Sequence, residues 1–174
     1  MTLSVINRLT WRAGPGDEAL AEDLLACLRD EPFAGRVVAV DLEMLGTEQE
    51  GDLGMSTGGY VDLRTGDVHD DSSTDPMMVG EDAAIDVEEP GRWLRFDRTG
   101  PRDGWRDMAD FAARQHDPAL RERMQTAIEG KVAFHRFRDL VHQESLAEQW
   151  YAFSTDRQLG RAREFLAGEG IRVR

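Results

Sequence analysis

The sequence predicts an α+β fold, in which a small antiparallel sheet with a β-hairpin packs against a C-terminal half of four to five helices. Two observations support this prediction: a hairpin pattern near position 65 and helical apolar spacing after position 104. With 174 residues the chain suits one core, so we expect a single domain. Within 1–174 we distinguish an N-terminal helical extension (1–35), an acidic β-rich part (36–97) and a helical part (104–174).

The N-terminal extension contains one strong helix pattern, over 17–30. Asp17 has a side chain suited to an N-cap, acidic residues follow it, and Pro32 prevents continuation. The single cysteine, Cys27, lies on the apolar stripe of this helix, so we expect a buried structural thiol.

The acidic β-rich part begins with the β-branched run 36–40, which predicts a short strand. Asp41 then suits the N-cap of a short helix that ends at Leu45. The segment "GYVDLRTGDV" predicts a hairpin with its turn at Thr65–Gly66, because Gly readily adopts a positive φ. "RWLRFD", at 92–97, alternates as a further strand.

The helical part shows apolar residues at helical spacing together with clear start and stop signals. Asp117–Pro118 pairs a capping side chain with proline at the first helical position. The predicted helices are 104–115, 118–130, 131–142, 146–153, and a last one that begins at Ser154 or Thr155 and ends at Gly168 or Gly170. The aromatic residues at buried spacing, which we expect to form core, are Trp93, Phe96, Trp105, Phe134, Phe137, Trp150 and Phe153.

Several of these segments together resemble a known family. They are the hairpin "GYVDLRTGDV", the strand "RWLRF", the helix at 105–111, the block "AIEGKVAFHRFRDLV", and the tail segments "QWYAF" and "AREFLAGEGI". Over 37–171 the chain resembles the bacterial Uncharacterised Protein Family 0158. The resemblance implies a bacterial protein of the same fold; it implies no established activity and supplies no catalytic residue.

The helix predicted at 131–142 carries one polar stripe, made by Lys131, His135, Arg138 and His142 at spacings of four, three and four. Lys131 is the only lysine in the chain, and it falls where helix N–H groups have no partner. These residues could bind an external anion, such as a phosphate or carboxylate. Two alternatives remain: Lys131 pairs with an acid of the same protein, which the 21 acids of residues 1–90 favour, or the stripe is simply a solvated face.

Other chemistry finds less support in the sequence. "GDVHDDSSTD" gathers His69 with several carboxylates, but its spacing matches no calcium or zinc motif, so we predict no metal site. No nucleophile motif surrounds any serine, cysteine or histidine, which leaves enzyme function open. No cofactor is predicted.

The charge distribution supplies the functional prediction. Residues 1–90 hold 5 Arg and 21 Asp or Glu, a net charge of −16, whereas residues 91–174 have a net charge of +3. We therefore predict a non-catalytic binding or regulatory module with a basic protein partner. The overall charge of −13 argues against a nucleic-acid partner, and no apolar run is long enough for a membrane span. The lone cysteine and the missing secretory signal predict a cytoplasmic protein.

Overall fold

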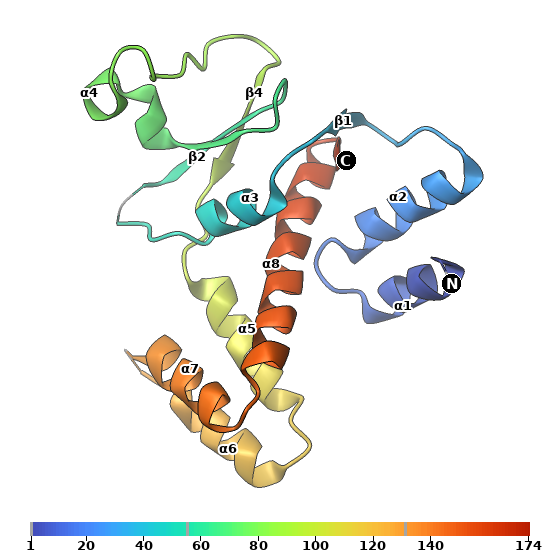
Figure 1. The fold of residues 1–174 in the computed structure, drawn as a ribbon, viewed down its shortest axis with the longest axis vertical. Helices are drawn as coiled ribbons and strands as arrows, with labels where there is room; N and C mark the ends of the chain where they lie inside the picture. Colours follow the sequence, from blue (N-terminus) through green and yellow to red (C-terminus); the bar gives the residue numbers. More distant parts are fainter. Residues whose placement is uncertain (1, 55, 131) are drawn as a thin grey trace. The chain divides into compact units, whose positions relative to one another are not determined.

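The computed structural model describes every residue except Met1, Met55 and Lys131, and it confirms the α+β class. The chain gathers into two compact units (Figure 1). Unit 1 comprises Met1–Gly100 with Gln158–Arg174, and unit 2 comprises Pro101–Arg157. Unit 2 is thus an insertion between two parts of unit 1.

Unit 1 begins with a helical hairpin of α1 (Thr2–Arg12) and α2 (Asp17–Arg29). Ile6 and Leu9 of α1 pack against α2. The prediction that Asp17 caps α2 is wrong, because Gly16 occupies that position with a φ of 66°. Asp17 is instead buried in the first turn of α2.

Cys27 is exposed, so the predicted buried thiol is also wrong. The reason is that the predicted stripe packs along only part of its length: Leu20, Leu24 and Leu25 pack against the buried cluster of α1 and α2. Ala19 and Ala21 are buried, whereas Leu28, which shares the predicted stripe with Cys27, is exposed.

A short parallel pair of strands joins distant parts of unit 1. Strand β1 (Arg36–Val38) pairs with β5 (Ile171–Val173), with Arg36 opposite Ile171. The sequence predicted the first strand but not the second. Helix α3 (Leu42–Gln49) follows, and the Asp41 side chain accepts hydrogen bonds from two of its N–H groups, both at 3.0 Å. This confirms the predicted cap, although α3 continues beyond the predicted end.

The second sheet of unit 1 has the strand order β3-β2-β4 and is antiparallel. Its strands are β2 (Gly58–Asp62), β3 (Val68–Asp70) and β4 (Trp93–Asp97). The predicted hairpin is confirmed. Gly66 in its turn has a φ of 89°, and a Cβ there would overlap the Ala39 carbonyl oxygen, so only glycine fits.

The segment between β3 and β4 contains a 3₁₀ turn (Asp71–Thr74) and the four-residue helix α4 (Pro76–Val79). Inside the sheet, one face supplies Val61 and Phe96 to the core of unit 1, where they join Leu45 and Leu166. The core therefore forms between the antiparallel sheet and the helices α3 and α8 (Ala147–Gly168).

Asp62, at the end of β2, is buried and binds Arg92. The Arg92 Nε and Nη2 atoms lie 3.0 and 2.7 Å from Asp62 Oδ2. Hydrogen bonding to Arg92 holds the pKa of Asp62 below its usual range, against the opposing effect of burial. This pair ties the turn end of the hairpin to the start of β4.

Unit 2 consists of α5 (Arg102–Ala113), α6 (Pro118–Ala127), α7 (Ala133–Gln143) and the first part of α8. Asp117 accepts a hydrogen bond from the Ala119 N–H at 3.0 Å, which confirms the predicted cap. Two helices were predicted between 146 and 170, but the structure has one continuous helix there. Ser154 does not cap a helix; its hydroxyl donates to the Tyr151 carbonyl within α8.

The core of unit 2 is aromatic. The rings of Phe111, Phe137 and Trp150 contact one another in edge-to-face geometry. The Phe153 ring contacts Phe111 at a tilted angle. The prediction that Phe134 and Trp105 belong to the core is wrong, because Phe134 is 48% exposed and Trp105 is 44% exposed. Trp105 remains anchored through its indole N–H, which donates to the Ile128 carbonyl at 3.0 Å.

Candidate functional site

The predicted polar stripe lies on α7, except for Lys131, which is outside the described residues. The structure brings two of its members together: Arg138 Nη2 lies 2.8 Å from His135 Nδ1. On the other side of the ring, His135 Nε2 lies 3.3 Å from an oxygen of Asp139. Because a guanidinium only donates, Nδ1 accepts, and the ring proton on Nε2 faces Asp139.

His142 is separated from this pair and has a different partner. Its Nε2 lies 3.2 Å from the Tyr151 hydroxyl, and the two rings meet at 6.1 Å between centroids. The stripe therefore consists of a His135–Arg138 pair and a separate His142–Tyr151 contact.

The His135–Arg138 pair lines a hollow in unit 2, which we call the α7 pocket. It has a volume of about 380 Å³. Its other walls are apolar, and the complete set of lining residues is Met108, Phe134, His135, Phe137, Arg138, Trp150 and Tyr151. Phe134 is thus exposed at the place where its ring forms part of the pocket wall.

The lining of the α7 pocket determines which ligands suit it. Aromatic walls favour a flat apolar body, and an exposed guanidinium favours a carboxylate or phosphate group. Few polar groups in a mostly apolar cavity are typical of small-molecule sites. Among the described residues, the lining contains no serine or cysteine.

Five of the lining residues were not predicted as site residues: Met108, Phe134, Phe137, Trp150 and Tyr151. Phe134 was assigned to the core, and Trp150 and Tyr151 lie beyond the turn that follows α7. No spacing rule links them to His135, since the path of the turn decides which α8 residues face α7. The signal in the sequence was the concentration of aromatic residues, since seven of the thirteen Phe, Trp and Tyr residues lie in 101–157.

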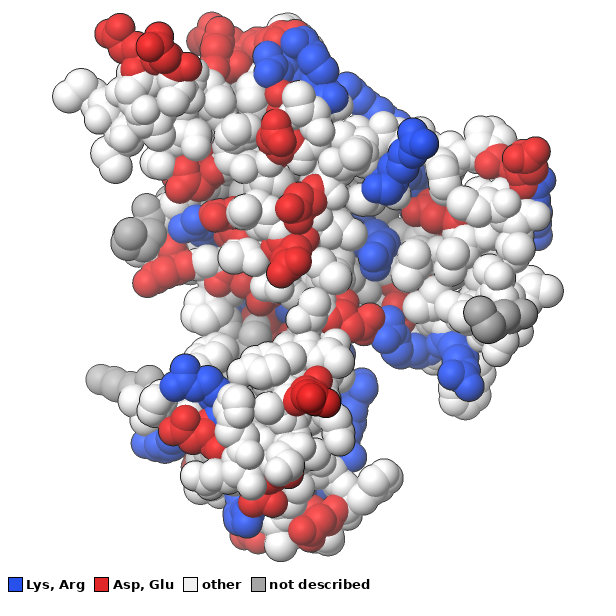
Figure 2. Space-filling view, in the orientation of Figure 1, with Lys and Arg blue, Asp and Glu red and all other residues white. Residues whose placement is uncertain are grey.

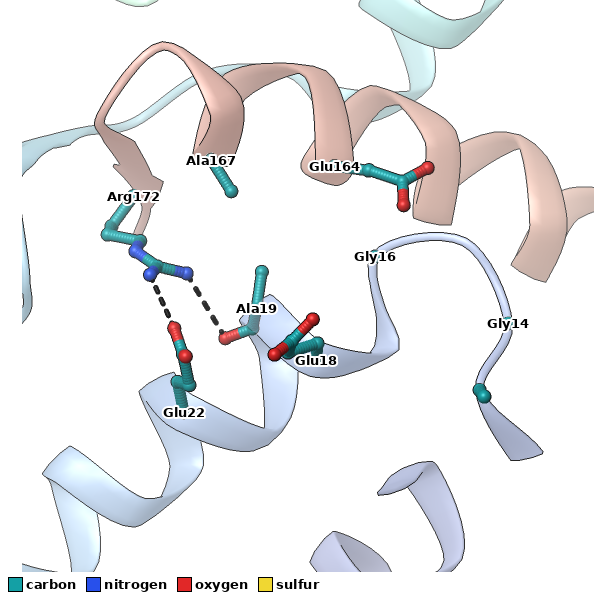
Figure 3. A pocket seen from close by; sticks show the side chains of 9 residues that line it. Gly14, Gly16, Glu18, Ala19, Glu22, Glu164, Ala167 and Arg172 are labelled. Atoms are coloured by element: carbon teal, nitrogen blue, oxygen red, sulfur yellow. Dashed lines mark hydrogen bonds and ion pairs between the residues drawn. The ribbon is translucent and has the colours of Figure 1, made fainter. Parts of the chain in front are cut away.

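A second hollow, of about 290 Å³, lies in unit 1 between α2, α8 and β5 (Figure 3). Its base is made of small residues, including Gly16, Ala19 and Ala167. Arg172 points into it, with Nη2 2.6 Å from a Glu22 oxygen and Nη1 3.4 Å from the Ala19 carbonyl oxygen. Arg172 is thus engaged with its own chain.

Two carboxylates border this second hollow, Glu18 on α2 and Glu164 on α8. Together with Glu22 they give the hollow an acidic rim. An anion is therefore disfavoured here, and of the two hollows only the α7 pocket contains residues of the predicted stripe.

The acidic segment after the hairpin uses its side chains locally. Asp70 accepts hydrogen bonds from the Ser72 and Ser73 hydroxyls, and Asp71 accepts from the N–H and hydroxyl of Thr57. His69 contacts the Trp93 ring instead, at 5.8 Å between centroids. Within the described ranges, no three His, Cys, Asp or Glu side chains converge as metal ligands would. In the same ranges, no helix combines the length and apolar character of a membrane span.

Comparison with known proteins yields no match to a family model, a curated protein or a solved structure. The resemblance to Uncharacterised Protein Family 0158 therefore stays a prediction.

Proposed function

We propose that the protein is a non-catalytic binding or regulatory module whose acidic surface faces a basic protein partner. One observation carries the proposal: residues 65–91 contain nine Asp or Glu residues and no Lys or Arg. Such a segment attracts a positively charged surface at long range and speeds its association.

The contacts narrow this surface to one part of the acidic half. Many acids of the acidic half serve internal pairs: Asp62 binds Arg92, Glu48 binds Arg98, and Glu50 binds Arg161. Of the exposed acids that form no ion pair with a Lys, Arg or His of the described chain, five lie together in 75–88, inside the segment that contains no Lys or Arg. We call these five the acidic tip: Asp75, Glu81, Asp82, Asp86 and Glu88.

The acidic tip keeps its charge available to a partner. Asp75 accepts a hydrogen bond from the Met77 N–H at 2.8 Å, and Asp86 accepts one from the Glu88 N–H at 3.0 Å. Backbone N–H groups carry no net charge, so neither hydrogen bond pairs the carboxylate with a cation. Figure 2 shows acidic side chains beside uncharged surface at the place that α4 occupies in Figure 1.

A pull-down with a charge-matched pair of variants tests the proposal. In the tip variant Glu81, Asp82, Asp86 and Glu88 are replaced by their amides; the control changes Glu43, Glu122, Glu164 and Glu169, which are exposed elsewhere, to Gln. We expect the wild type and the control to retain a basic protein at about 0.1 M salt and to release it at about 0.5 M. The tip variant should not retain it. Retention by the tip variant, or binding that ignores salt, would contradict the proposal.

A second candidate function is small-anion binding, as a binding protein or an enzyme, on the face of Lys131, His135 and Arg138. The observation that favours it is that His135 and Arg138 line the α7 pocket with aromatic side chains. We propose as ligand a planar aromatic carboxylate or phosphate, because its ring would contact Phe134 and Tyr151 while its anion contacts Arg138.

Thermal unfolding with phenyl phosphate tests this candidate, with inorganic phosphate as the comparison. We expect phenyl phosphate to raise the Tm of the wild type by mass action, and Arg138→Gln to abolish the rise. Arg136→Gln, on the same helix but bonded to the Glu129 carbonyl, should keep it. Lys131→Ala should weaken the rise if Lys131 contacts the anion. Equal shifts in all variants, or none in the wild type, would refute the candidate.

A further inference from the structure

Helix α4 exposes two adjacent methionines at the centre of the acidic tip. Met77 is 92% exposed and Met78 is 71% exposed, and the adjoining Val79 is also exposed. Burying a methionine side chain stabilises a folded protein, so leaving both side chains in water forgoes that stabilisation. Isolated exposed apolar residues are common, but a contiguous apolar group of this kind is typical of an interaction surface.

The local structure holds these methionines outward. Asp75 caps α4, and Pro76 occupies its first position. Gly80 ends it with a φ of 90°, and its N–H donates to the Pro76 carbonyl at 2.9 Å. The base of the segment is closed by a hydrogen bond from the Ile85 N–H to the Ser73 carbonyl, also at 2.9 Å. The exposure is thus a property of a folded turn.

The surrounding charge indicates what kind of surface could cover the methionines. Each of the five carboxylates of the acidic tip lies within eleven positions of Met77. A second copy of the tip, an anionic lipid surface and a nucleic acid would all be repelled by these charges. A segment rich in Arg or Lys would be attracted, and it could place an apolar side chain against the methionines. Methionine is flexible and polarizable, which suits it to contacts with an irregular apolar surface.

We propose that Met77 and Met78 are the apolar anchor of the acidic tip, and that they bind a basic amphipathic helix of a partner protein. An apolar stripe of that helix contacts the two thioethers, while its Arg or Lys residues face the tip carboxylates. This inference rests on the proposed function, because it assigns the contact residues of the same surface.

The test uses two synthetic peptides of equal charge. Both are helical peptides of about sixteen residues rich in Arg; one carries Leu at positions i, i+4 and i+7, and the other carries Ser there. Binding is measured by fluorescence titration against the wild type and Met77→Ser/Met78→Ser. The control is Leu3→Ser/Leu28→Ser, which changes exposed apolar residues of α1 and α2. Circular dichroism checks that each variant is folded.

We expect the methionine variant to lose at least tenfold in affinity for the Leu peptide, while the control variant loses none. The Ser peptide should bind weakly, and equally to all three proteins. If the Leu and Ser peptides bind the wild type equally and the charge-altered tip variant binds neither, Met77 and Met78 are not anchor residues. The proposal that the acidic tip binds a basic partner would still hold. If the tip variant binds both as well as the wild type does, the proposed function itself fails.

Two further outcomes would also overturn the anchor. One is binding of the wild type to phosphatidylcholine vesicles that the methionine variant loses, which would assign the patch to a lipid surface. The other is a concentration-dependent dimer in sedimentation that the same variant abolishes, which would assign it to a second copy of the chain.

Discussion

Arg157→Ala is expected to lower the free energy of unfolding by about 3–5 kcal/mol, because it removes a cationic partner of the buried carboxylate of Asp107. Asp107 is 1% exposed, and its Oδ1 lies 2.5 Å from Arg157 Nε. The same guanidinium binds Asp110 at 3.0 Å and lies over the Phe153 ring. Denaturant unfolding followed by circular dichroism measures the loss.

Arg123→Ala is the matched control, since it removes an arginine from an exposed ion pair with Glu144 in the same unit. Surface pairs contribute about 1 kcal/mol or less, so this variant should unfold nearly as the wild type does. Arg157→Lys should fall between the two, because lysine keeps the charge but cannot bind two carboxylates in the same geometry. If Arg157→Ala were no more damaging than Arg123→Ala, the Asp107 pair would not stabilise unit 2 as we infer.

Gly160→Ala is expected to destabilise unit 1 by about 1–3 kcal/mol, although alanine is the better helix former. A Cβ at Gly160 would overlap the Pro15 carbonyl oxygen, and a Cβ at Gly16 would overlap the Gly160 carbonyl oxygen. The α1–α2 loop and α8 therefore meet backbone to backbone. The loop must shift to admit even one methyl group, so amides of α1 and α2 should exchange with solvent faster.

Gly168→Ala provides the comparison on the same helix. A Cβ there meets nothing within 4 Å, so the substitution should be neutral or stabilise by up to about 1 kcal/mol. An unchanged exchange rate for α1 and α2 in Gly160→Ala would mean that the loop adapts without loss.

The parts of the fold that the sequence predicted are those decided by local chemistry. Asp41 and Asp117 cap their helices because their side chains reach N–H groups two or three residues ahead. The Thr65–Gly66 turn follows from the backbone freedom of glycine. Each of these features is contained within a few neighbouring residues, which is why the pattern alone identifies it.

The parts that it did not predict depend on contacts between distant residues. Strand β5 has only three residues, and it becomes a strand because β1 offers it hydrogen bonds. Ser154 and Thr155 suggested a helix start, but they lie in the middle of α8, whose two ends pack in different cores. The tendency of Ser or Thr to start a helix is overridden when the residues on both sides of it pack as one continuous helix.

The candidate site was predicted in part. Helical spacing placed His135 and Arg138 on one face, and the structure brings them into contact. The same spacing grouped His142 with them, although its partner is Tyr151. The aromatic walls of the α7 pocket were predicted as core, because spacing reports which residues share a face but not whether that face is completely covered.

The parallel pairing of β1 with β5 has a consequence for synthesis of the chain. Arg36 and Ile171, which are register partners, lie 135 positions apart, and unit 2 is translated between them. Unit 2 is complete once Arg157 has left the ribosome, whereas unit 1 waits for Gln158–Arg174. Domains usually fold in the order in which they emerge, but here we expect the inserted unit to fold first. Until Gln158–Arg174 has emerged, β1 in the acidic N-terminal segment lacks its partner strand β5.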